Sequence, residues 1–287
     1  MTEMLEFAGG EHAVLMLHGL SGSPLEMRRT GELLNKAGFT VFIPNIEGFA
    51  YGGGATPWQD WIAKTQTYVQ NLQPRFSTLS LVGLSMGATL ALVVAAQEKV
   101  TGGLVLLAPA MGYDGWAIPW YRIFLDIAKH LPFRQFYRYG ETEPFGIKNE
   151  KIRARIKKAF EEKEVSEVGG ATISLEHVIQ GDYLTAEARR LAHQVSCPTL
   201  IIHAIDDETI HPRHADWLYK NISAVDKEIL FLGDSYHMIT LDNERQMVFN
   251  ETEEFLKRTI NIQTGTAIFE IPDRMTRGFQ RYAKQRL

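Results

Sequence analysis

The sequence contains very little cysteine and no large excess of either charge. Cys197 is the one thiol in 287 residues, which excludes an intramolecular disulfide. Because Cys197 precedes Pro198 at the entry to an apolar run, we interpret it as a small core residue and not as a nucleophile. The formal net charge is -4, with acidic and basic residues interspersed, and this pattern argues against a nucleic-acid partner.

The sequence also lacks the patterns of a secretory signal and of a transmembrane helix. Residues 1–12 (MTEMLEFAGGEH) are acidic and have neither a basic start nor a long apolar core, which predicts a cytoplasmic protein. Residues 79–97 carry no charged side chain and approach the length of about 20 residues that a membrane span needs. Their glycines and serines are better explained by a strand and a buried helix joined by a turn, so we expect no stable membrane insertion.

What the sequence does contain is an alternation of short apolar runs with helical patterns. The runs that predict strands lie at residues 13–17, 40–43, 79–82, 103–108, 198–204 and 228–232. The helical patterns between them lie at residues 26–37, 59–72, 88–97 and 214–222, and a last helix follows the final loop. Strands that alternate with helices predict an α/β fold, in which a mostly parallel sheet is flanked by helices.

The alternation stops at Pro109 and resumes near Pro198. We therefore predict a core in two parts, at residues 1–110 and 196–260. A largely helical cap is inserted between them at residues 111–195, and a C-terminal extension follows at residues 261–287. Aromatic residues crowd the first half of the cap, where they either form its own core or line an apolar pocket. The charged segment 151–164 predicts an amphipathic helix. The extension adds five basic residues and is interpreted as a packing arm or an oligomer contact.

The stretch LVGLSMGA at residues 81–88 places Ser85 between Gly83 and Gly87, after a predicted strand and before a predicted helix. At such a sharp turn, glycines on both sides remove the Cβ atoms that would collide and leave the serine hydroxyl exposed at the tip. The start of the helix also directs unpaired N–H groups toward that tip, where they stabilise a developing negative charge. This pattern predicts a nucleophilic serine.

A serine hydroxyl is a poor nucleophile unless a base removes its proton and an acid holds that base in the right tautomer. Loops at the carboxyl ends of parallel strands meet at one edge of the sheet, so we expect the acid and the base in such loops. The predicted strand 198–204 leads to Asp206 and Asp207, and the last predicted strand leads to His237. Of the nine histidines, His237 alone occupies the loop after the final strand, and we predict it as the base.

The other histidines and the neighbouring aspartate have different interpretations. His203 lies inside a predicted strand as a core residue, while His211 and His214 lead into a helix that they cap or decorate. Adjacent residues on an extended loop project in different directions, so only one of the two aspartates reaches the histidine. We favour Asp207, because Ile210 lies three positions further on and anchors the loop.

A serine that attacks a carbonyl group also needs two backbone N–H donors, which stabilise the oxyanion that forms. Met86 supplies one donor, because it follows the nucleophile at the start of a helix. Leu20 supplies the other, from the turn LHGLSGS after the first long strand. In that turn we interpret His18 as a brace for the loop and not as a group that transfers protons.

Four segments together resemble the α/β-hydrolase superfamily, namely LMLHGLSGSP, LVGLSMG, PTLIIHAIDDETIHP and YHMITLD. They are most similar to bacterial carboxylesterases and monoacylglycerol lipases, whose histidine loop commonly reads His-x-Ile-Thr-Leu-Asp. The resemblance covers residues 11 to about 258 and implies a fold of that superfamily with no metal or organic cofactor. It implies Ser85, Asp207 and His237 as the catalytic residues, and Leu20 and Met86 as the oxyanion donors. Two positions depart from the usual pattern, because Ala204 and Tyr236 stand where glycine is frequent, and Tyr236 adds bulk on the leaving-group side.

These residues predict a serine hydrolase of carboxylic esters that acts through an acyl-enzyme intermediate. The aromatic cap, with Trp116 and Trp120 as substrate-binding residues, favours acyl chains of short to medium length, and monoacylglycerols are a candidate substrate. A thioesterase, an amidase or a carbon–carbon bond hydrolase would use the same residues, because the motifs specify machinery and not substrate. An alternative of another class is a non-catalytic protein of this fold that binds a small apolar ligand.

Overall fold

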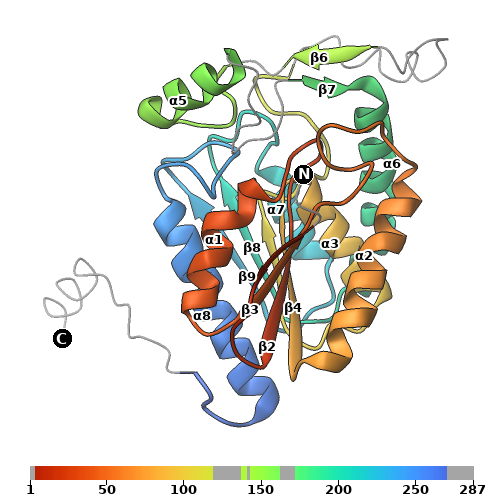
Figure 1. Cartoon of the computed structure of the whole chain (residues 1–287), viewed down its shortest axis with the longest axis vertical. Helices are drawn as coiled ribbons and strands as arrows, with labels where there is room; N and C mark the ends of the chain where they lie inside the picture. The colour runs from red at the N-terminus through yellow and green to blue at the C-terminus, as the bar shows by residue number, and fades with distance from the viewer. Residues whose placement is uncertain (1–3, 119–136, 141–142, 162–171, 270–287) are drawn as a thin grey trace, which may run out of the picture.

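The computed structural model describes residues 4–118, 137–140, 143–161 and 172–269. A seven-stranded sheet forms its centre, with the strand order β1-β3-β2-β4-β5-β8-β9 (Figure 1). The strands are β1 (Met4–Phe7), β2 (His12–Leu17), β3 (Thr40–Pro44), β4 (Thr78–Leu84), β5 (Leu104–Leu107), β8 (Thr199–Ala204) and β9 (Lys227–Leu232). Neighbouring strands are parallel except β1, which pairs antiparallel with β3. The mostly parallel sheet confirms the predicted α/β class.

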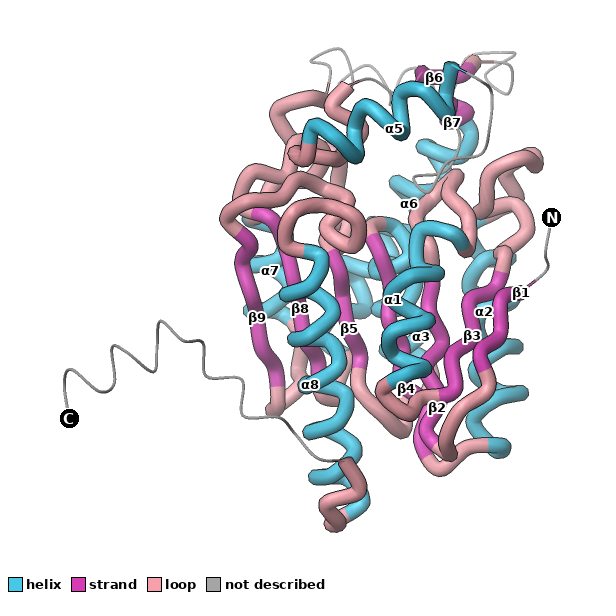
Figure 2. Tube along the Cα trace, turned by 60° about the vertical axis from the view of Figure 1, so that its left-hand side comes forward, coloured by secondary structure: helices cyan, strands magenta, loops and turns pink. Residues whose placement is uncertain are grey.

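Helices cover both faces of the sheet (Figure 2). The helices of the described residues are α1 (Leu25–Lys36), α2 (Trp58–Leu72), α3 (Met86–Gln97), α5 (Glu150–Glu161), α6 (Leu175–Leu191), α7 (Arg213–Asn221) and α8 (Arg245–Thr264), with short 3-10 helices η1 (Gln73–Arg75) and η4 (Ala192–Gln194). Each face has its own hydrophobic core, one formed with α1 and α8 and the other with α2, α3, α6 and α7. Successive residues of β2 alternate between the two, because side chains along a strand point to opposite faces.

The charge-free stretch at residues 79–97 consists of β4 and α3. Helix α3 is apolar all round because it lies between the sheet and α6, and its residues 86–95 are all buried. Among the residues that the structure describes, no helix combines the length and the apolar character needed to cross a bilayer.

Two features of the fold were not predicted from the sequence. Strand β1 lies at the edge of the sheet and is only partly buried, so it lacks the continuous apolar run that marks the central strands. A second, two-stranded antiparallel sheet joins β6 (Arg138–Gly140) to β7 (Thr172–Ser174). Both strands are three residues long, which is too short for an alternating pattern to be recognised.

The insertion between β5 and β8 lies over the carboxyl ends of the strands, with α5, β6 and β7 at the top of the molecule (Figure 1). The helix predicted at residues 151–164 is α5, which begins one residue earlier. Helix α6 links the insertion to the core. Its second half contributes Leu184, Ala188 and Leu191 to the core that it shares with α3. In its first half, Leu175 and Ile179 belong to a separate small cluster.

The described part of the C-terminal extension folds back onto the core. Helix α8 ends at Thr264 and is capped by Gly265, which has a left-handed φ of +66°. Beyond it, Phe269 stacks on Phe39 with ring centroids 5.1 Å apart and lies against His12 at the start of β2. Asn261 holds this turn through two hydrogen bonds to the main chain of Phe269. The five basic residues that the extension adds lie outside the described residues.

Candidate active site

Ser85 occupies the sharp turn between β4 and α3, at the carboxyl edge of the sheet. Its backbone has φ 56° and ψ −121°, a conformation that residues with a side chain rarely adopt. The Ser85 N–H donates to the carbonyl of Leu107 on the neighbouring strand at 2.8 Å, and its own carbonyl accepts from the Ala110 N–H at 3.2 Å. The turn is therefore held by the strand beside it as well as by the helix that it begins.

The two glycines that flank Ser85 are required by space. A Cβ atom on Gly83 would overlap the carbonyl oxygen of Gly87 and the backbone of Ala88. A Cβ atom on Gly87 would overlap the carbonyl oxygens of Leu17 and His18 at the end of β2. The helix can start this close to the sheet only because both positions lack a side chain.

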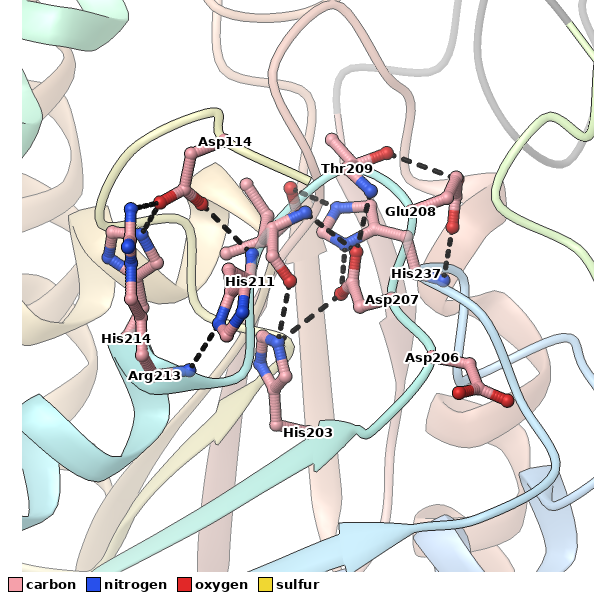
Figure 3. Close-up of polar contacts among 12 residues, drawn as sticks. Asp114, His203, Asp206, Asp207, Glu208, Thr209, His211, Arg213, His214 and His237 are labelled. Carbon is pink, nitrogen blue, oxygen red and sulfur yellow. Dashed lines mark hydrogen bonds and ion pairs between the residues drawn. The ribbon is translucent and has the colours of Figure 1, made fainter. Parts of the chain in front are cut away.

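Three side chains from three loops form a continuous chain of hydrogen bonds. His237, in the loop after β9, has Nε2 2.8 Å from Ser85 Oγ. Its Nδ1 lies 2.8 Å from Oδ2 of Asp207, in the loop after β8 (Figure 3). Because a carboxylate only accepts, Nδ1 carries the hydrogen and Nε2 is left to accept the proton of the Ser85 hydroxyl. This arrangement can remove a proton from Ser85 as the serine attacks an electrophile.

Asp207 is held in the ionised form that this arrangement needs. It is 2% exposed, and its Oδ1 accepts the N–H groups of Thr209 at 2.9 Å and Ile210 at 2.7 Å. Burial favours the neutral acid, but the charge and the hydrogen bond of His237, with smaller contributions from His203 and the Ile210 N–H, outweigh it. The pKa of Asp207 therefore lies below its ordinary value of 3.8.

Asp206 has a different set of partners. Its exposed carboxylate accepts from the Lys148 ammonium at 2.9 Å, and Lys148 also lies 3.4 Å from Asp234. These neighbours raise the pKa of Lys148, with the Asp206 hydrogen bond as the largest cause. Figure 3 shows Asp206 directed away from His237. Of the two adjacent aspartates, the structure brings only Asp207 to the histidine.

The structure also brings together the two residues predicted to stabilise an oxyanion. Leu20 lies in the turn after β2, and Met86 is the first residue of α3. A Cβ atom on Gly19 would lie 3.8 Å from Ser85 Cβ, so this turn runs beside the serine. Gly181 of α6 packs over both side chains, because a Cβ atom there would lie 3.0 Å from Leu20 and 3.2 Å from Met86.

Two buried side chains hold this turn in place. Glu26, in the first turn of α1, accepts the Gly19 N–H at 2.7 Å, and a Cβ atom on Gly22 would overlap its carboxylate. The His18 ring lies 2.8 Å, through Nδ1, from the Gly19 carbonyl and packs on Phe49. Full burial lowers the pKa of His18 to about 4, so the ring is neutral at neutral pH. Sequence reasoning identified the brace at His18 but not the one at Glu26.

Sequence reasoning also missed the residues that fix the acid and histidine loops. Asp242 is fully buried and accepts four main-chain N–H groups, from Tyr236, Lys148, Asn149 and Asn243, at 2.7–2.9 Å. The signal for this role was present, because Asp242 closes the segment YHMITLD. His203, at the end of β8, lies 3.1 Å from the Ile210 carbonyl and 3.5 Å from Asp207 Oδ2.

The insertion is bonded to these same loops at two points along its length. On the entering side, the N–H groups of Gly115 and Ala117 donate to the carbonyls of Thr209 and Glu208, both at 2.9 Å. Further along the insertion, just before α5, Asp242 accepts the N–H groups of residues 148 and 149, and the carbonyl at residue 146 accepts from the Met238 N–H at 2.8 Å. The insertion therefore contacts the acid loop through its first residues and the histidine loop through residues 146–149, which precede α5.

A second polar cluster lies beside the acid loop (Figure 3). Asp114 binds His214 Nε2 at 2.9 Å, the N–H of His211 at 3.0 Å and the guanidinium of Arg213. The other ring nitrogen of His214 faces Arg189 at 3.0 Å, so the histidine donates through Nε2 to Asp114. These bonds tie the start of the insertion to α7. His211 and His214 therefore belong to this cluster, and neither is bonded to Ser85.

Trp116 lies at the outer side of the acid and histidine loops. Its side chain is 65% exposed, its Nε1 donates to the Asp206 carbonyl at 3.4 Å, and its ring meets the Tyr236 ring edge-on with centroids 5.9 Å apart. Trp120, the other predicted substrate-binding residue, lies outside the described residues. In the described ranges, no group of three or more His, Cys, Asp or Glu side chains is arranged to hold a metal ion.

The chain matches known proteins over most of its length. The family model described as "Serine aminopeptidase, S33" matches residues 10–245. The chain is 30% identical over 252 residues to a thermostable monoacylglycerol lipase of Bacillus sp. (strain H-257). The aligned region covers 87% of this chain and 92% of that relative. It is 25% identical over 256 residues to a carboxylesterase of Bacillus subtilis (strain 168), covering 88% and 95%. A solved structure from work on the metagenome-derived lipolytic enzymes LipS and LipT superposes with a TM-score of 0.74 at 26% identity, covering 89% and 97%.

Proposed function

The chain belongs to the serine aminopeptidase S33 family of α/β hydrolases, and from this premise we propose that it cleaves carboxylic esters of short to medium acyl length through an acyl-enzyme intermediate. The membership agrees with the resemblance carried by the four sequence segments. At the level of the family, the protein is an esterase- or lipase-like serine hydrolase. The observation that carries the proposal is the chain of two 2.8 Å contacts that links Asp207, His237 and Ser85.

In the proposed mechanism, His237 accepts the Ser85 proton as Oγ attacks the ester carbonyl. The N–H groups of Leu20 and Met86 stabilise the oxyanion of the tetrahedral intermediate. His237 then donates the proton to the departing alcohol, and Asp207 stabilises the imidazolium while it exists. Water repeats the same steps in the second half of the cycle, releasing the acid and restoring the serine.

The substrate class rests on the relatives and on the rim of the site. The two curated relatives are named a monoacylglycerol lipase and a carboxylesterase, which supports an ester with an apolar acyl chain. Trp116 and Tyr236 offer an aromatic surface beside the histidine loop, and apolar surface favours an acyl chain over a charged one. We therefore propose monoacylglycerols and related simple esters as substrates, with Trp116 at the acyl or leaving-group side of the site.

Labelling with a fluorophosphonate probe tests the mechanism, because only an activated serine reacts appreciably with it. We expect the probe to label Ser85, and Ser85→Ala to lose both labelling and ester hydrolysis while it stays folded. Ser77→Ala is the matched control, since Ser77 lies just before β4, at the opposite end of that strand. Full esterase activity in Ser85→Ala would refute the proposal.

A substrate panel then tests the class of bond. Esters, thioesters and anilides with the same acyl chains are compared on the purified protein, with acyl lengths from acetate upward. We expect the esters to give the highest kcat/KM. A preference for anilides would indicate an amidase, as the name of the family model suggests. Binding of the acyl chain without labelling or turnover would indicate a non-catalytic binding protein.

A further inference from the structure

Two consecutive carboxyl groups hold His237 at two different points. Asp207 faces the ring nitrogen Nδ1 at 2.8 Å, while Glu208 Oε2 accepts the main-chain N–H of the same histidine at 3.1 Å (Figure 3). Both residues are buried, and Glu208 is only 3% exposed. A glutamate is almost never buried to this extent without a specific partner, so its place here calls for a role.

The shape of the acid loop explains how neighbours in the sequence reach the same residue. On an extended strand, consecutive side chains point in opposite directions. Here the chain bends around the Asp207 carboxylate, whose Oδ1 accepts the N–H groups of Thr209 and Ile210. The bend turns the Glu208 side chain toward the histidine loop, where it meets the backbone of His237.

Glu208 is itself fixed on three sides. Its Oε1 accepts from the Thr209 hydroxyl at 3.1 Å, and its carbonyl accepts the Ala117 N–H at 2.9 Å. Gly115 packs directly on the Glu208 backbone, where a Cβ atom would overlap the Glu208 carbonyl. A side chain held in this way keeps Oε2 at a defined position, within hydrogen-bond distance of the His237 N–H.

We propose that Glu208 is a positioning residue for His237, which aims the imidazole at Ser85 by accepting the main-chain N–H while Asp207 accepts the ring N–H. The inference rests on the proposed function of Ser85 and His237. A buried N–H group without an acceptor is costly, so the histidine loop would move if the acceptor were withdrawn. A displacement of about 1 Å at a catalytic group can reduce turnover on the order of 100-fold.

The role assigned to Glu208 depends on its reach and not on its charge. Burial raises the pKa of its carboxyl, the neighbouring Asp207 acts in the same direction, and His237 acts against both. Either form of the carboxyl presents an oxygen that accepts an N–H group. An amide oxygen at the same distance does the same, whereas a shorter carboxylate keeps the charge but loses the reach.

Two variants therefore separate reach from charge. Glu208→Asp should lower kcat on a short ester about 100-fold with a much smaller change in KM, because it withdraws the acceptor by one methylene group. Glu208→Gln should recover most of that loss and show the native midpoint on the acidic side of its pH–rate profile. Glu253→Gln is the control at another buried glutamate, which pairs with Lys257 one turn further along α8.

A second measurement does not depend on turnover. Hydrogen exchange at the His237 amide, followed by NMR, should be slow in the native protein and in Glu208→Gln and at least 10-fold faster in Glu208→Asp, because only the last lacks the acceptor. Native turnover in Glu208→Asp, or a loss in Glu208→Gln as large as in Glu208→Asp, would overturn the proposal. So would fast exchange at this amide in the native protein. If no ester is hydrolysed but the exchange pattern holds, the proposed function fails while the contact between Glu208 and His237 stands.

Discussion

The Lys148 ammonium lies 2.9 Å from the Asp206 carboxylate, one residue before the carboxylate that faces His237. Lys148 belongs to the insertion between β5 and β8, so the first of the two adjacent aspartates is bonded to the insertion and the second to the histidine. The two side chains have the same chemistry and differ in the neighbours that the fold gives them. Exchange of each for its amide should therefore have unequal effects.

Asp207→Asn should be nearly inactive, and Asp206→Asn should keep substantial activity. The amide at position 207 no longer fixes the histidine tautomer, a defect that can cost on the order of 10,000-fold in kcat. The amide at position 206 weakens an exposed ion pair, which contributes about 0–1 kcal/mol. Steady-state kinetics of both folded variants on one ester give the ranking, and the reverse ranking would move the acid to Asp206.

Gly87→Ala should destabilise the protein and lower its activity. The added methyl group meets the carbonyl oxygens of Leu17 and His18, so either β2 or the start of α3 must move, at a cost of about 1–3 kcal/mol or more. Gly53→Ala is the matched control, because nothing lies within 4 Å of the Cβ position there. Urea unfolding measures both variants; equal stabilities would show that the turn has room.

The stability of the protein should fall as the pH drops from 6.5 toward 4, in part because of His18. The pKa of its buried ring is lowered from 6.5 to about 4, so over this range the unfolded chain binds the proton before the folded one does. This difference lowers the free energy of unfolding by about 3 kcal/mol over that interval, at about 1.4 kcal/mol per pH unit. Well above pH 6.5, His18 is neutral in both states and contributes no pH dependence.

Urea unfolding at pH 7 and pH 4.5 checks this expectation. His18→Gln cannot take up a proton, so its deficit relative to the native protein should shrink at the lower pH. His193→Gln replaces an exposed histidine and is the control. A constant difference between His18→Gln and the native protein at the two pH values would contradict the expectation.

Trp116→Ala should change the acyl-length profile more than the rate on acetate esters. The exposed ring covers Tyr236, next to the proposed base, and a longer acyl chain has more apolar surface to lose when it is removed. The ratio of kcat/KM for a medium-chain ester to that for acetate is the readout, with Trp116→Phe as the conservative comparison. An unchanged ratio would show that Trp116 only packs against the loop; the same test applies to Trp120.

Features set by residues close together in the chain could be predicted from the sequence, whereas contacts between distant residues could not. Strands, helices and the turn at Ser85 are governed by residues close together in the chain, whose spacing and side-chain volume can be read directly. Asp242 acts through Lys148, 94 residues away, and Glu208 through His237, 29 residues away. Such carboxylates look like surface residues until the fold buries them, because charged side chains are usually exposed. The structure places Asp207, and not Asp206, 2.8 Å from the His237 ring, whereas the role of Asp207 as the catalytic acid stays a prediction.

The hydrogen bonds that join the insertion to the acid and histidine loops limit where a chimera can be joined. Replacement of the entire segment between β5 and β8 with that of a relative would also replace the donors for Glu208, Thr209 and Asp242, which come from residues 115–117 and 148–149. Junctions placed after residue 118 and before residue 143 would leave those donors in the recipient. New specificity is therefore most safely grafted between these two points, where the acid and histidine loops keep their own supports.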